Sequence, residues 1–313
     1  MQKPTNYLLT IISLLFLFQI AYGQEEIDIQ IIPKWEKGDS LNYIIHKEKT
    51  ETVNGELVKS NKGSLMAKFK VLDVAENGYK IQWLYQTDFE SLGIPEKYHD
   101  ALKDFSQIKV VYRTDQNGVF QEVLNTAELM SNMEQSLKKF FSILKKEEPE
   151  MADDMDFAMS QTIELFKDKQ LIESIAFKEI KLLHGLYGNY FTSKEKETYQ
   201  EDAPNILGSI PLSIKSSIWL DTIQADQVAI IKKESEIDEE ELKQLIGKIQ
   251  SQFDLKNKED LNSIKIKLKD RYEMHFDLKT GNILKAASER IVDGQEVKGK
   301  TLVKELMSIE LVK

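Results

Sequence analysis

The chain has 313 residues, of which 41% are hydrophobic and 30% charged, and it contains no cysteine. This composition is typical of a globular protein and excludes collagen-like, low-complexity and disulfide-stapled classes. The formal net charge of −10 results from 52 acidic and 42 basic residues. Duplex nucleic acid is bound through clustered basic surface, so we expect no nucleic-acid partner.

Residues 1–23 have the layout of a secretory signal peptide. Lys3 supplies a short positive region, an apolar run follows over residues 8–20, and Ala21 and Gly23 are the small residues of a cleavage site. The run is shorter than the roughly 20 residues of a membrane-spanning helix. We expect cleavage near Gly23 and a periplasmic or extracellular protein that is not integral to a membrane; an uncleaved anchor is the alternative.

Residues 24–125 predict a β-meander. Large apolar side chains share one parity over residues 79–89, and a similar alternation covers residues 65–71, as in strands with one buried face. A register slip of one residue would expose the whole set, so Trp83 is expected inside. Three Asn-Gly pairs, which readily form tight turns, separate the expected strands: residues 54–55, 77–78 and 117–118.

Residues 126–190 predict a helical block. Apolar residues recur at helical spacing over residues 129–144, and Asn125 with Glu128 has the sequence of a capping pair. A last short helix is expected over residues 176–186. The block also carries a methionine stripe, which fits either helix core facing the sheet or the lining of an apolar cavity: Met130, Met133, Met151, Met155 and Met159.

Residues 191–313 predict further strands and one helix, which begins at the acidic run 238–241. The clearest strand covers residues 264–278, where the odd positions from 265 to 277 are charged or His and the even ones, Asp270 excepted, are apolar or aromatic. Such a strand would span about 50 Å, which favours a large, curved sheet. Turns are expected at residues 280–282 and 293–294.

These patterns together predict an α+β fold in which residues 24–313 form a single domain. A large curved antiparallel β-sheet, an open or half barrel, would pack over a central helical block. The acidic runs at 153–156 and 238–241 lack the spacing of a calcium-binding loop and suit helix N-termini.

The sequence contains no motif of a catalytic, metal or cofactor site. The four histidines, His46, His99, His184 and His275, form no HExxH pair, and GxSxG, P-loop and GxGxxG motifs do not occur. His46 and His275 fall on the polar parity of their strands and are expected at the surface. We therefore expect a non-enzymatic protein without metal or cofactor.

The one-sided aromatic strands and the methionine stripe favour an apolar or amphiphilic ligand, such as a lipid, held between sheet and helices. The alternative is a structural or interaction module with a solid core and no small-molecule ligand; the sequence indicates no particular protein partner. A cavity of several hundred Å³ would distinguish the two. The expected ligand-binding residues are Trp83, Tyr85, Met155, Met159, Tyr187, Tyr272 and Phe276.

Three short elements carry a family resemblance: His-Gly-Leu-Tyr-Gly-Asn-Tyr at 184–190, Pro-Asn-Ile-Leu-Gly at 204–208, and Trp35-x-Lys37-Gly38-Asp39. They resemble an uncharacterised family of secreted proteins from gram-negative bacteria with LYGxxY and PNxxG elements. This resemblance implies no activity and no catalytic residue. Long amphipathic strands over helices are also similar in outline to the half-barrel lipoprotein carriers of the periplasm, an analogy of architecture only.

Overall fold

The computed structural model describes residues 28–90, 94–165, 177–192, 195–203, 212–252, 265–296 and 299–312. The expected signal peptide and the Pro-Asn-Ile-Leu-Gly element lie outside the described residues.

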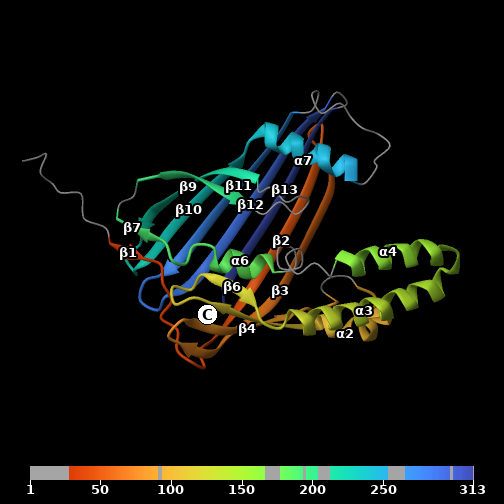
Figure 1. The fold of residues 1–313 in the computed structure, drawn as a ribbon, viewed down its shortest axis with the longest axis horizontal. Coiled ribbons are helices and arrows are strands. Elements are labelled where there is room, and N and C mark those ends of the chain that lie inside the picture. The colour runs from red at the N-terminus through yellow and green to blue at the C-terminus, as the bar shows by residue number, and fades with distance from the viewer. Residues whose placement is uncertain are drawn as a thin grey trace, which may run out of the picture.

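An eleven-stranded antiparallel sheet forms most of the structure and is not closed into a barrel (Figure 1). The strand order is β6-β5-β4-β3-β2-β13-β12-β11-β10-β9-β8, so the last strand pairs with the first long one, and the helical block joins the two edges. The strands are β2 (Ser40–Val53), β3 (Glu56–Ala75), β4 (Gly78–Gln86), β5 (Gln107–Thr114), β6 (Phe120–Val123), β8 (Glu197–Ala203), β9 (Leu212–Ile223), β10 (Val228–Ile237), β11 (Lys265–Asp277), β12 (Asn282–Glu296) and β13 (Gly299–Leu311). The two short strands β1 (Ile29–Gln30) and β7 (Tyr190–Phe191) form a separate pair.

Tight turns connect the first three long strands: the predicted Asn54-Gly55 turn is confirmed, whereas the turn between β3 and β4 is formed by Glu76 and Asn77, one residue before the predicted pair. Asn54 and Gly55 both have positive φ, 53° and 87°, and form a two-residue turn between β2 and β3. Gly78 begins β4, and a Cβ there would lie 2.0 Å from the Thr114 carbonyl oxygen. The turn expected at residues 293–294 is wrong, because β12 continues through Gly294, which pairs with Thr301.

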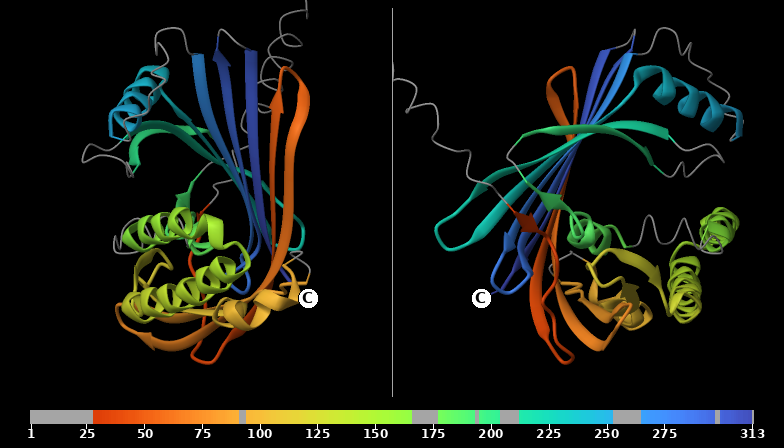
Figure 2. Two further views of the ribbon diagram at one scale, coloured as in Figure 1. Left: turned by 90° about the vertical axis from the view of Figure 1, so that its right-hand side faces the viewer. Right: turned by 60° about the vertical axis from the view of Figure 1, so that its left-hand side comes forward.

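The helices are η1 (Glu96–Tyr98), α2 (His99–Ser106), α3 (Thr126–Glu147), η2 (Pro149–Met151), α4 (Ala152–Leu165), α6 (Lys178–His184) and α7 (Glu239–Gln252). Figures 1 and 2 show that α3 and α4 project beyond the sheet, whereas α6 lies against it and α7 lies near the opposite end of the long strands. We call α2, α3 and α4 the helical lobe. Helical packing on the sheet is thus more limited than a central block would require. No helix of the described residues has the length and apolar character needed to cross a membrane.

Asn125 joins the lobe to the edge of the sheet. Its side chain lies 3.3 Å from Glu128 but does not cap α3. Instead, Oδ1 accepts a hydrogen bond from the Val111 amide at 2.8 Å, and Nδ2 donates to the Lys109 carbonyl at 2.9 Å. Strand β6 pairs with β5 only from Tyr112 onward, so the asparagine satisfies edge groups that β6 leaves unpaired.

The hydrophobic core lies on one face of the sheet, the core face, which carries Tyr43, Trp83 and Phe276. Helix α6 packs on this face. The opposite face, which carries His46, Glu48 and Glu310, is called the open face. The predicted burial of Trp83 is confirmed, since its side chain is 0% exposed. The alternation expected from 264 to 278 is also confirmed within β11, where even positions are the more buried.

Candidate functional site

Four of the sequence-predicted ligand residues lie in the packed core. Trp83, Tyr85, Tyr187 and Phe276 are at most 7% exposed. The Trp83 ring stacks on Tyr43 with centroids 5.7 Å apart, and Tyr187 meets Phe276 edge-on at 5.8 Å. The structure therefore brings these aromatics together as mutually packed core side chains.

Three polar contacts hold α6 and the turn that follows it against this core. Glu179, 3% exposed, forms an ion pair with Lys47 of β2 and accepts a hydrogen bond of 3.0 Å from the Tyr85 hydroxyl. Burial, followed by the nearby Glu179 carboxylate, raises the pKa of Tyr85 well above its usual range. The Tyr187 hydroxyl, one turn beyond α6, donates to the Gly281 carbonyl at 2.8 Å. Helix α6 is thus tied to three separate parts of the sheet.

His184 provides a further tie and was expected only as part of a motif. Its ring is 2% exposed; Nδ1 lies 2.8 Å from the Gly118 carbonyl oxygen and Nε2 lies 2.8 Å from the Tyr112 hydroxyl. Burial lowers the pKa of His184 to about 4. The imidazole is therefore neutral at physiological pH and serves packing.

The remaining predicted ligand residues lie elsewhere. Tyr272 is half-buried beyond the core on the same face, where burial and the neighbouring Asp270 carboxylate raise its pKa to about 12. Met155 and Met159 are half-buried on α4, in the part of the lobe that projects beyond the sheet (Figure 1). Met159 lines a small hollow with residues of α3. The two methionines therefore do not join the sheet aromatics around one cavity.

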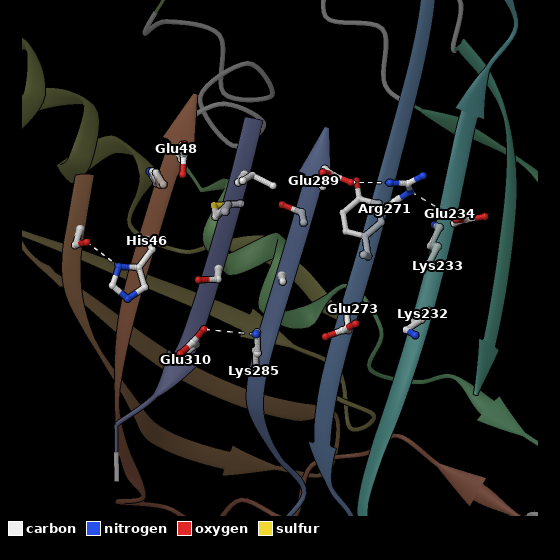
Figure 3. A pocket seen from close by; sticks show the side chains of 18 of the residues that line it. His46, Glu48, Lys232, Lys233, Glu234, Arg271, Glu273, Lys285, Glu289 and Glu310 are labelled. Carbon is white, nitrogen blue, oxygen red and sulfur yellow. Dashed lines mark hydrogen bonds and ion pairs between the residues drawn. The ribbon is translucent and has the colours of Figure 1, made fainter. Parts of the chain in front are cut away.

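A groove of about 650 Å³ lies on the open face (Figure 3). Its floor follows one line of paired residues that crosses six adjacent strands from β10 to β3: Lys232, Glu273, Ala287, Ser308, His46 and Ser64. The middle of this line is low because Ala287 and Ser308 are small. A twisted sheet is saddle-shaped and therefore hollow along one diagonal on each face. Helix α6 packs on the core face, whereas the open-face hollow carries the groove.

Long charged side chains form one wall of the groove and, together with Leu306, the other wall. Lys285 and Glu310 form one wall and lie 3.7 Å apart. On the other wall, Arg271 contacts Glu289 at 2.9 Å and Glu234 at 3.7 Å (Figure 3). A hydrogen bond from Lys304, together with the nearby Arg271, holds the pKa of Glu289 below its usual range. Glu289 is thus charged and paired at neutral pH.

The two ends of the groove differ in chemistry. At one end, His46 Nδ1 lies 2.7 Å from Ser64 Oγ, and Lys62 pairs with Glu48 at 3.0 Å. At the other end, Trp219 of β9 pairs with Lys232 of β10. The Lys196 ammonium lies 4.4 Å from the centroid of the Trp219 indole ring. The groove therefore offers an imidazole and a hydroxyl at one end and an aromatic surface at the other.

The lining is close to neutral although the chain is acidic. Four Lys or Arg side chains of the open face line it together with five Glu side chains, whereas the side chains of the bordering Lys47 and Lys233 lie on the core face. The backbone amides of the floor belong to the strand ladders, so a ligand would find its hydrogen-bond partners among side chains. Around the His46–Ser64 contact, the floor therefore presents no free backbone amides that could stabilise an oxyanion. Within the described part of the chain, no His, Asp or Glu cluster is arranged to hold a metal ion.

The groove was not predicted from the sequence. Its signal is the pair of small residues Ala287 and Ser308 at paired open-face positions, next to the charged pair Lys285 and Glu310. Their alignment with His46 depends on the pairing of β13 with β2, strands more than 240 residues apart.

Fold and groove together define an open antiparallel-sheet protein with a charge-balanced surface groove. No protein-family model matches the chain, and no curated protein matches it significantly.

Proposed function

We propose that the chain is an exported, non-enzymatic binding protein that takes its ligand in the open-face groove. The observation that carries this proposal is the line of small and polar side chains from Lys232 to Ser64, walled by ion pairs on both sides. A volume of about 650 Å³ falls within the range of ligand sites. The secreted family suggested by the short motifs fits this proposal.

An apolar ligand between sheet and helices has less support. It would have to displace α6 and separate Lys47 from Glu179 and Tyr112 from His184. Each separation would leave a buried polar group without its partner, which costs free energy. The solid packing at α6 also favours a second candidate function, a structural or interaction module that binds no small molecule.

Filling the groove tests the binding proposal. The variant Ala287→Phe places an aromatic ring on the floor, where a strand tolerates it. Thr50→Phe is the matched control, because Thr50 of β2 also lies on the open face of the sheet but does not line the groove. We expect wild type and Thr50→Phe to bind the same component of an immobilised glycan and peptide array, and Ala287→Phe to bind at least tenfold more weakly.

Equal binding by all three folded proteins, or no binding by wild type, would overturn the groove as the site. Recovery of the bound component after incubation tests the non-enzymatic part, since a binding protein returns it unchanged. Mass spectrometry of protein isolated from its cells tests export: we expect a mature chain that begins at Gln24.

A further inference from the structure

We infer that the ligand of this groove is a neutral, linear, polyhydroxylated molecule, that is, an oligosaccharide chain. The inference rests on the proposed function and names the chemistry that the groove recognises.

Charge pairing in the walls carries the first step. Lys285 faces Glu310, Arg271 faces Glu289, and Lys62 faces Glu48. An anionic or cationic ligand would compete with one member of each pair and leave the other member uncompensated. A hydroxyl group donates to a carboxylate and accepts from an ammonium, so a polyol bridges both members without separating them. The lining therefore favours a ligand without net charge.

The length and ends of the groove carry the second step. The floor line makes five interstrand steps from Lys232 to Ser64, roughly 24 Å at about 4.8 Å per step. An extended chain of several units fits this length better than a single small molecule. Trp219 supplies an apolar surface on which the C–H faces of a sugar ring can pack. The His46 and Ser64 side chains supply hydrogen bonds at the other end of the groove.

The probes are neutral hexasaccharides (maltohexaose, cellohexaose and N-acetylchitohexaose), uronate oligomers, and hexapeptides that contain both Lys and Glu. We expect wild type to bind a neutral hexasaccharide, with a Kd that changes less than twofold between 50 and 500 mM NaCl. Charged ligands would show a much steeper dependence, because salt screens their attraction.

The variant Glu310→Gln removes one member of a wall pair and leaves Lys285 free. We expect it to gain at least fivefold affinity for uronate oligomers relative to wild type. Glu236→Gln is the control, because Glu236 of β10 lies on the open face outside the groove lining. This variant should leave the affinity for uronate oligomers unchanged.

The outcomes separate this inference from the proposed function. If a peptide or a charged oligomer binds best and Ala287→Phe abolishes that binding, the groove is a binding site but the inference is overturned. If Ala287→Phe leaves every binding event unchanged, the groove itself is not the site.

Discussion

Hydrogen bonding fixes the protonation of His184. The Gly118 carbonyl can only accept, so Nδ1 carries the proton and Nε2 accepts from the Tyr112 hydroxyl. A second proton would place a buried charge beside groups already satisfied, and burial accordingly lowers the pKa to about 4 from its ordinary 6.5. The unfolded chain therefore binds this proton first as the pH falls.

The resulting pH dependence of stability has a definite sign. The contribution of neutral His184 is complete above pH 6.5 and is lost as the pH falls from 6.5 to about 4. The loss amounts to at most roughly 3 kcal/mol. Urea denaturation of wild type and His184→Gln at pH 7.5 and 4.5 measures it, and we expect the variant to lose less between the two pH values. The same loss in both proteins would contradict the assignment.

Trp83 tests whether the core is solid at the position expected to face a ligand. The side chain is fully buried and contacts the rings of Tyr43 and Tyr85. Trp83→Ala should lower the free energy of unfolding by about 3–5 kcal/mol, since the resulting cavity cannot close completely. Chemical denaturation gives the value. A loss below about 0.5 kcal/mol is typical of surface sites and would refute the core assignment.

At the scale of the element, α6 is held by an asymmetric ion pair. Glu179 is buried, whereas the side chain of Lys47 is 49% exposed. Lys47→Met leaves a buried carboxylate without its countercharge and should cost about 2–4 kcal/mol. Glu179→Gln leaves a lysine that can reach water and should cost about 1 kcal/mol. Urea denaturation of both variants at pH 7.5 checks this order, and equal losses would show that Glu179 is not effectively buried.

Sequence periodicity predicts the elements well and their partners poorly. The alternation in β4 and β11 identifies the buried face, because a half-buried strand must alternate. The methionine stripe shows that one face of α4 is covered, but the same pattern arises whether a sheet or a neighbouring helix covers it. Likewise, Gly294 fits a turn or the interior of β12, and only the long-range pairing decides between them.

The candidate site depends on the whole molecule more than on any element. Ala287, Ser308 and His46 belong to three strands, and the pairing of β13 with β2 places them in one line. No local pattern encodes that register, because each strand shows only a small or polar residue at one position of its open face. The twist of the sheet then makes the line a hollow rather than a ridge. The burial of the core aromatics, by contrast, can be predicted from the sequence. Successive side chains of a strand point to opposite faces, so the alternation within one strand identifies its buried side chains.

The sheet and the helical lobe are expected to open separately. The lobe contacts the sheet through β5, and Phe140 of α3 packs on Tyr98 of the adjoining η1, with ring centroids 5.5 Å apart. Native-state hydrogen exchange should show lower protection in α4 than in β2 and β13, because fewer buried contacts hold it. Phe140→Ala should speed exchange in the lobe and leave the central strands protected, whereas Trp83→Ala should reduce protection of the strands. If Phe140→Ala instead lowered protection equally in α4, β2 and β13, lobe and sheet would form one cooperative unit.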